Sequence, residues 1–232
     1  MIRTEERQGK EMPDNKREVR FLEMEVRAEE EEQGAVITGY PIVFNQITDI
    51  GGGIREMIAP EAVGDGKVLR DTVLLVGHDF GSIPLARSRR NNGSGTMQLT
   101  PDEHGVRMAA TLDVKNNPKA AEVYSAIKRG DVSGMSFAFI VGKEEWEDVD
   151  TESPLRRITG FSEIYECSIV PFPAYPGTSV QAASEGGAPE GVIASLESER
   201  QRLAEDRERA AQEERRRASI ERLEKLQKEV RA

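Results

Sequence analysis

Two histidines and one cysteine limit the side-chain chemistry open to this chain of 232 residues. His78 follows an apolar run, residues 73–76, and a glycine, so its side chain can project from the rigid end of a buried strand. His104 stands in Pro-Asp-Glu-His-Gly between two alternating segments, which is typical of a solvated turn. His78 is therefore the candidate catalytic base, while position alone leaves a structural histidine at the rim of the core equally open.

Ser136 is the candidate nucleophile. It lies in the apolar segment Gly-Met-Ser-Phe-Ala-Phe, residues 134–139, where a hydroxyl must either bond to nearby backbone or serve a chemical purpose. Serine catalysis needs a hydroxyl, a neutral imidazole within hydrogen-bond reach and a group that orients the imidazole. A serine that merely packs within a strand is the equal alternative. No glycine follows at the position that the nucleophile elbow of the α/β-hydrolases requires.

Two carboxylates compete for the role of orienting group. Glu163 and Glu166 both lie in Phe-Ser-Glu-Ile-Tyr-Glu-Cys-Ser-Ile-Val, residues 161–170, and they face opposite sides of a strand. Glu166 shares its side with Ile164 and Ser168, a face that we expect to point inward. A carboxylate in such surroundings needs a polar partner, whereas Glu163 is expected to be solvated.

Cys167 is a rival nucleophile. No helix N-terminus or basic cluster in the nearby sequence would lower its pKa, so we interpret it as a small buried hydrophobe. A single cysteine forms no internal disulfide, which fits a reducing compartment. Two distant histidines and one cysteine show no metal-ligand spacing, so neither a metal nor a cofactor is expected.

Composition divides the chain into four parts. Charged residues make up 32% of the chain and hydrophobic residues 37%, and the charges gather at both ends. We predict a charged tail over residues 1–33, one domain over residues 34–182, a flexible Gly/Ala/Ser linker over residues 183–193 and a charged helix over residues 194–232. Apolar and polar residues alternate in part over segment 17–28, which could therefore be an edge strand, although Leu22 breaks the alternation.

Net charge and hydropathy exclude some partners. The net charge of −10 argues against nucleic-acid binding, which needs a basic surface. No apolar run approaches the ~20 residues needed to span a bilayer, and the first residues lack the apolar region of a secretion signal. A soluble, intracellular protein that binds no membrane is expected.

The domain pattern predicts an α+β fold that is mainly β. Strands are expected at residues 35–46, 73–76, 133–142 and 160–172, together with a hairpin over residues 96–114. Segment 60–63 is typical of the first turn of a short helix, because proline stands at its start. An amphipathic helix is predicted from Asn117 to Gly130, with its capping residues in place.

The order of these motifs resembles the tailed-phage prohead (capsid maturation) protease family, which is related in fold to the herpesvirus assemblins. The resemblance covers roughly residues 34–182 and is carried by Leu-Leu-Val-Gly-His-Asp, by Gly-Met-Ser-Phe-Ala-Phe and by Tyr-Glu-Cys-Ser-Ile-Val-Pro-Phe-Pro-Ala-Tyr-Pro-Gly-Thr. It implies an assemblin-like closed β-barrel surrounded by a few helices.

The resemblance also implies site residues. The family's histidine falls on His78 and its serine on Ser136, and its glutamate falls on Glu166. Aligning the second histidine of the assemblins instead would select Glu163, so both positions stay open with Glu166 preferred. The oxyanion donors are not predicted, because the loop at residues 171–174 contains two prolines, which have no N–H.

Two functions follow from these residues. The first is a serine endopeptidase that cleaves scaffold and capsid segments, and itself, during prohead maturation. It would act inside the immature capsid in the cytoplasm of the host bacterium, with the major capsid protein and scaffold segments as substrates; a homodimer is left open. The alternative is a catalytically inactive scaffold or capsid-assembly protein that binds through the C-terminal helix. The joint presence of His78, Ser136 and Glu166 favours the enzyme.

Overall fold

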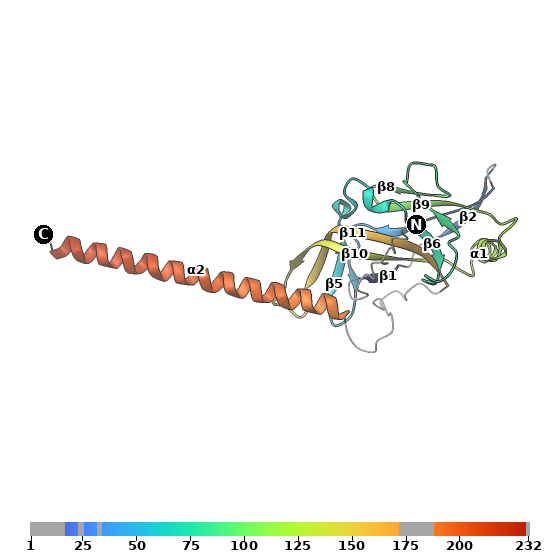
Figure 1. The fold of residues 1–232 in the computed structure, drawn as a ribbon. Coiled ribbons are helices and arrows are strands. Elements are labelled where there is room, and N and C mark those ends of the chain that lie inside the picture. The colour runs from blue at the N-terminus through green and yellow to red at the C-terminus, as the bar shows by residue number, and fades with distance from the viewer. Residues whose placement is uncertain (1–16, 23–25, 32–33, 172–187, 231–232) are drawn as a thin grey trace, which may run out of the picture.

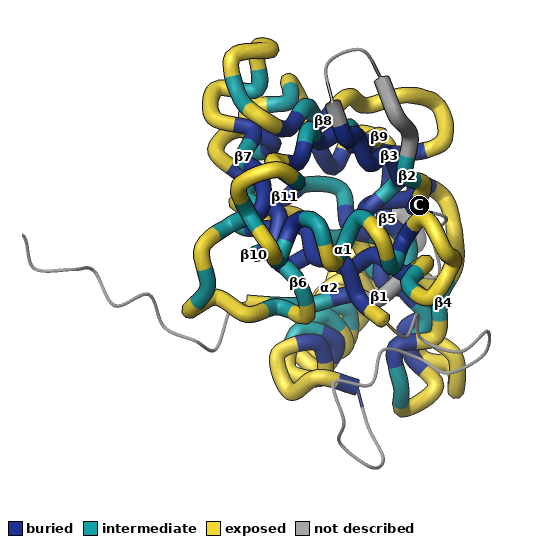
Figure 2. The backbone as a smooth tube through the Cα atoms, turned by 90° about the vertical axis from the view of Figure 1, so that its right-hand side faces the viewer, coloured by how far each residue is buried: buried dark blue, intermediate teal, exposed yellow. Residues whose placement is uncertain are grey.

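The computed structural model describes residues 17–22, 26–31, 34–171 and 188–230 (Figure 1). These residues are mainly β and contain two α-helices, as the sequence pattern predicts. The strands form one sheet of seven and one of four. Buried residues concentrate in the strands, while many of the connecting loops are exposed (Figure 2).

The seven-stranded sheet, sheet A, holds Ser136 and Glu166, and His78 follows its strand β6. Its strands are β1 (Glu18–Leu22), β4 (Thr48–Asp49), β5 (Arg55–Ile58), β6 (Val73–Val76), β7 (Ala86–Arg87), β10 (Gly134–Glu147) and β11 (Leu155–Val170). The antiparallel pair β10–β11 forms its centre, and β1 lies beside β10. The short strands β5 and β6 run parallel to the first and last parts of β11. Alternation along β10 turns Met135, Phe137 and Phe139 into the core, so that Ser136 and Ala138 face the other side.

The second sheet, sheet B, is antiparallel in the order β2-β3-β9-β8. Its strands are β2 (Arg27–Glu31), β3 (Gly34–Val43), β8 (Met97–Pro101) and β9 (Gly105–Leu112). The hairpin predicted for residues 96–114 is confirmed by β8 and β9. Its turn is closed by the Asp102 side chain, which accepts hydrogen bonds from the backbone N–H groups of His104 and Gly105.

The closed β-barrel implied by the family resemblance is not what the structure contains. On one side the two sheets are linked by the chain, because the consecutive strands β1 and β2 belong to different sheets: β1 pairs with β10 in sheet A, and β2 pairs with β3 in sheet B. On the other side the described edge strands contact each other without forming a ladder: β7 pairs with β6 and β8 pairs with β9, while the Arg87 N–H donates a hydrogen bond to Thr96 Oγ1 (3.0 Å). The two sheets therefore pack around a shared core without one continuous ladder of strands.

The predicted tail also differs from the structure in part. Residues 1–16 lie outside the described residues, but β1 and β2 both fall within segment 1–33 and pair with the central strands of the domain. The weakly alternating segment 17–28 is therefore a structural part of both sheets, and the globular part begins before Gly34.

The helices inside the domain follow their sequence signals. Helix α1 (Pro118–Arg129) begins where the Asn117 side chain accepts hydrogen bonds from two backbone N–H groups, and it ends at Gly130, whose φ is 78°. The short 3-10 helices η2 (Pro60–Val63) and η3 (Lys67–Leu69) precede β6, and η2 has the proline start expected from the sequence.

Helix α2 (Glu190–Val230) starts four residues earlier than predicted and is attached to the domain. Val192 and Leu196 are buried against Ile50, Ile54 and Val149. The Trp146 indole donates a hydrogen bond to Ser195 Oγ (3.1 Å), and Arg200 donates one to the Val149 carbonyl (2.7 Å). Side chains 204–223 are exposed, and this part of α2 extends away from the domain (Figure 1). Part of the predicted linker lies outside the described residues, but its last residues belong to this attachment.

Candidate active site

His78 stands at the end of β6, where the chain leaves the sheet in a left-handed conformation. Gly77 and His78 have φ values of 60° and 59°. Such values are uncommon for a residue with a Cβ atom, so other contacts must hold the turn in place. Gly77 N–H donates a hydrogen bond to the Ile169 carbonyl (2.9 Å), and His78 N–H donates one to Ser168 Oγ (3.0 Å). Both bonds tie the turn to β11.

Glu166 lies beside the imidazole of His78. The His78 Nδ1 atom is 2.7 Å from Glu166 Oε1, and the Glu166 side chain is fully buried. The second carboxylate oxygen, Oε2, accepts a hydrogen bond from Ser168 Oγ (2.6 Å). With Glu166 ionised, the proton of a neutral imidazole lies on Nδ1, and Nε2 carries the lone pair that a general base needs.

Glu163 occupies a different environment. Glu163 is exposed, and its carboxylate accepts a hydrogen bond from the Tyr165 hydroxyl. The partial burial of Tyr165, together with this hydrogen bond, raises the pKa of the tyrosine. Of the two glutamates that the sequence left open, the structure brings Glu166 to His78.

Ser136 lies on the neighbouring strand, β10, on the same side of sheet A. Its backbone is directly opposite Ser168 in the β10–β11 ladder, and the next residue on that face, Ala138, is opposite Glu166. Residues paired in this way have Cβ atoms about 5 Å apart. We call His78, Ser136, Glu166 and Ser168 the histidine cluster. All but His78 are fully buried, and 15% of the His78 side chain is exposed.

The hydroxyl of Ser136 points toward β1. Ser136 Oγ donates a hydrogen bond to the Arg20 carbonyl oxygen (2.6 Å). A hydroxyl has one hydrogen, so in this rotamer Ser136 cannot also donate to His78. Transfer of that proton to the imidazole requires rotation about the Cα–Cβ bond of Ser136.

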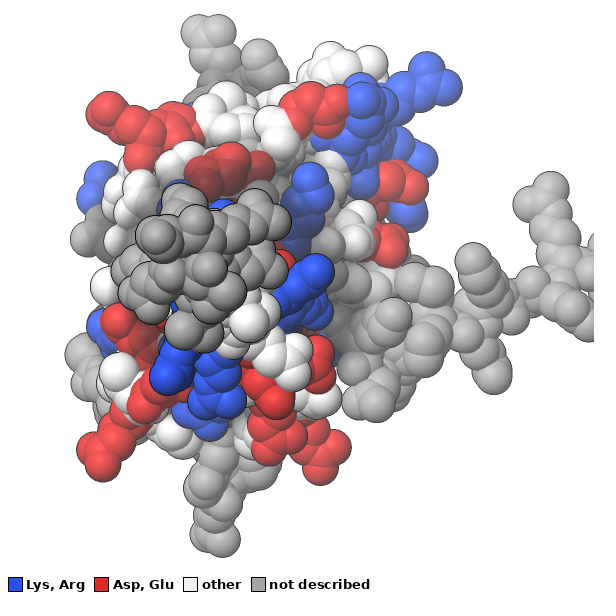
Figure 3. Space-filling model, turned by 90° about the vertical axis from the view of Figure 1, so that its left-hand side faces the viewer, with Lys and Arg blue, Asp and Glu red and all other residues white. Residues whose placement is uncertain are grey.

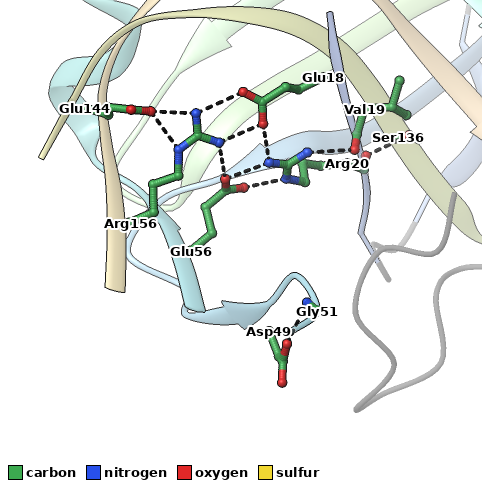
Figure 4. A network of polar contacts seen from close by, with 9 residues as sticks. All are labelled: Glu18, Val19, Arg20, Asp49, Gly51, Glu56, Ser136, Glu144 and Arg156. Carbon is green, nitrogen blue, oxygen red and sulfur yellow. Dashed lines mark hydrogen bonds and ion pairs between the residues drawn. The ribbon is translucent and has the colours of Figure 1, made fainter. Parts of the chain in front are cut away.

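A buried network of ion pairs holds β1 against the sheet (Figure 4). We call this network the ion cluster, and its members are Glu18, Arg20, Glu56, Glu144 and Arg156. Arg20 donates to Glu56 (2.7 Å), and Arg156 donates to Glu18 (2.7 Å) and to Glu144 (2.7 Å). Burial opposes the charge of Glu18, but the hydrogen bond from Arg156 and the charge of Arg20 lower its pKa below the usual value. The ion pairs of the cluster hold in place the strand whose carbonyl accepts the Ser136 hydroxyl.

The remaining candidates have structural surroundings. Cys167 packs in the core with 1% of its surface exposed, and burial, followed by the charge of Glu166, raises the pKa of its thiol. A thiol that is hard to ionise is a poor nucleophile, in agreement with its interpretation as a buried hydrophobe. His104 is exposed in the β8–β9 turn, and its ring contacts Tyr40 edge-on at 4.7 Å. His104 is therefore a turn residue, as its sequence predicts.

Two residues that contact the candidate site, Ser168 and Arg20, were not assigned a role from sequence. Ser168 stands two residues after Glu166, and this spacing in a strand was the available signal. Arg20 lies in a charged segment that gave no sign of burial. The loop at residues 171–174, considered above for the oxyanion donors, lies outside the described residues except for Pro171.

A cavity of about 540 Å³ lies away from the histidine cluster. It is lined by Arg17, by β10 around Gly142 and by the first turn of α2 near Val192. None of His78, Ser136 and Glu166 lines it.

Comparison with known proteins shows the family of this chain. Residues 22–190 match the family described as caudovirus prohead serine protease. The chain is also 26% identical to the prohead protease of Enterobacteria phage HK97 over 173 residues, which cover 74% of this chain and 70% of that protein. Comparison with the solved structures gave no match.

Proposed function

Because the chain belongs to the caudovirus prohead serine protease family, we propose that Ser136 is its nucleophile, His78 its general base and Glu166 the group that orients His78. The observation that carries this assignment is the 2.7 Å contact between His78 Nδ1 and Glu166 Oε1, next to a serine on the adjacent strand. Residue types, tautomer and placement on one face of the sheet all suit a serine protease.

The proposed reaction begins with the Ser136 hydroxyl turning from the Arg20 carbonyl toward His78 Nε2. Ser136 Oγ attacks the carbonyl carbon of the scissile peptide bond while His78 Nε2 takes its proton. The imidazolium is stabilised by Glu166 and gives this proton to the leaving amine nitrogen as the C–N bond breaks. Water then attacks the acyl-enzyme with His78 again as the base, which releases the acid and restores the serine.

Access to Ser136 requires a conformational step. Its side chain is fully buried, so a substrate carbonyl cannot meet Oγ in the described conformation. Since β1 pairs with β10 beside Ser136, a small shift of this strand is the movement that we propose. Such opening would limit cleavage to peptides that are correctly presented.

The substrates that we propose are segments of the capsid and scaffold proteins, and the chain itself, inside the prohead in the host cell. No helix of the described ranges is both long and apolar enough to cross a membrane.

Lys and Arg side chains are interspersed with Asp and Glu on the face from which α2 extends (Figure 3). The exposed half of α2, with Ile220 and Leu223 uncovered, would bind helices of the assembling shell.

The decisive test combines processing with covalent labelling. Full-length protein would be produced together with its capsid and scaffold proteins, and cleavage followed by mass spectrometry. A fluorophosphonate, which reacts with activated serines, should modify the peptide that contains Ser136. Ser136→Ala should abolish cleavage and labelling, whereas Ser88→Ala, at an equally buried serine outside the site, should retain both. Wild-type cleavage by Ser136→Ala would overturn the assignment.

A further inference from the structure

We infer that Ser168 is a positioning residue that holds His78 and Glu166 in their reactive arrangement; this role rests on the proposed function. Ser168 is fully buried on β11, two residues after Glu166 and directly opposite Ser136. It touches both partners of the proposed dyad: Oγ accepts from His78 N–H (3.0 Å) and donates to Glu166 Oε2 (2.6 Å). The sequence motif alone gives it no such role.

The direction of both hydrogen bonds is fixed by chemistry. A backbone N–H can only donate, so Ser168 Oγ is the acceptor in its bond to His78. The single hydrogen of Ser168 is then left for Glu166 Oε2, and Glu166 accepts it. The contacts close a ring in which Glu166 binds the side chain of His78 directly and its main chain through Ser168.

The first consequence concerns the backbone of His78. A residue with φ of 59° adopts a conformation that is unfavourable for a side chain with a Cβ atom. The bond from His78 N–H to Ser168 Oγ holds this turn at the edge of the sheet and thereby fixes the position of the His78 Cα atom, from which the imidazole projects. Without it, the imidazole would be placed less precisely relative to Ser136 while the strands stay intact, which lowers kcat.

The second consequence concerns the charge on Glu166. A carboxylate that accepts a hydrogen bond from Ser168 shares its negative charge between that hydroxyl and the imidazole. Removal of the hydroxyl leaves the charge facing His78 alone, which stabilises the imidazolium over the neutral ring. Since the base must be neutral to act, the acid limb of activity then moves to higher pH.

The test compares kcat and KM across pH for wild type, Ser168→Ala and Ser168→Thr, with a peptide taken from a mapped cleavage site. Ser168→Ala should lower kcat by about 10- to 100-fold with KM little changed, as expected for a lost hydrogen bond to a charged group. Its acid limb should move to higher pH. Ser168→Thr keeps the hydroxyl and should restore the wild-type limb and most of kcat.

Ser88→Ala is the matched control. Ser88 is also fully buried, and its Oγ accepts from the Thr72 N–H (3.0 Å) and donates to the Leu69 carbonyl (2.8 Å), away from the histidine cluster. It should lose stability like Ser168→Ala but keep the wild-type pH profile. If Ser168→Ala does not fold, Ser168→Cys decides, because a thiol is a weaker donor and should shift the limb in the same direction.

Failure of the Ser168 inference can be distinguished from failure of the proposed function. An unshifted acid limb in the folded Ser168 variants, with activity that falls only as in Ser88→Ala, would reduce Ser168 to a packing role and overturn the inference. Retained activity in Ser136→Ala would instead overturn the proposed function, whatever the Ser168 variants do.

Discussion

Sheet A buries two polar clusters, and they meet the cost of burial in different ways. The ion cluster pairs three carboxylates with two guanidinium groups, and Arg20, Glu56 and Arg156 are each at most 4% exposed. The histidine cluster sets one carboxylate against an imidazole and a hydroxyl. Arginine stays charged at all relevant pH values, whereas histidine changes its charge near neutrality. Of the two clusters, the histidine cluster is the one suited to move a proton.

Arg20 connects the two clusters. Its side chain belongs to the ion cluster, and its carbonyl oxygen accepts the hydroxyl hydrogen of Ser136 (Figure 4). The contacts that fix β1 therefore also fix the resting position of the proposed nucleophile. Variants on each side should separate loss of chemistry from loss of stability.

The largest effect is expected from Glu166→Gln. The amide keeps the size of the side chain but would present an N–H or a neutral oxygen to His78 Nδ1, which disturbs the tautomer and removes the charge that stabilises the imidazolium. We expect kcat to fall by about 10³- to 10⁴-fold, the range seen when the acidic member of such a triad is neutralised. Peptide cleavage at saturating substrate measures it.

Glu163→Gln is the control for that variant. Glu163 is exposed and contacts Tyr165 rather than His78, so its loss should leave kcat within about twofold of wild type, in the range of a surface change. If Glu163→Gln proved the more damaging variant, the third member of the triad would be reassigned.

The sequence predicted the histidine cluster better than the ion cluster, for physical reasons. A histidine is rare in this chain, and strand alternation assigned Glu166 to an inward face, where the structure has it. Charged residues, by contrast, normally indicate solvent. Arg20 and Arg156 reach Glu56 across separations of 36 and 100 residues, which local patterns do not reveal. The same holds for the barrel, because closure depends on edge strands that are distant in sequence.

The second largest effect is expected when one partner of the ion cluster is removed. Arg20→Met leaves buried Glu56 with fewer compensating charges, and we expect a loss of about 3–5 kcal/mol in the free energy of unfolding. Chemical denaturation measures this loss. The double variant Arg20→Met, Glu56→Met removes both charges and should regain much of it.

An exposed ion pair provides the comparison. Arg87 and Asp71 are 2.7 Å apart, but their side chains are 43% and 62% exposed. Water already solvates both groups, so Arg87→Met should leave the unfolding midpoint close to that of wild type. Equal losses in Arg20→Met and Arg87→Met would mean that burial does not give the ion cluster its importance.

The smallest effect in solution is expected from shortening α2. The helix joins the sheet beside the ion cluster, since Ser195 contacts Glu144, and further along the helix Arg207 forms an ion pair with Asp150 of the domain (2.7 Å). Deletion of residues 208–232 should therefore leave peptide cleavage and the unfolding midpoint unchanged, but it should reduce the amount of protease recovered inside particles. Leu196→Ala, within the attached part, should instead cost about 2 kcal/mol or more, because Leu196 is buried against the domain. If the deletion lowered peptide cleavage, the exposed half of α2 would contribute to the catalytic domain, and the ion cluster, beside which α2 attaches, would not be separate from the chemistry of the histidine cluster.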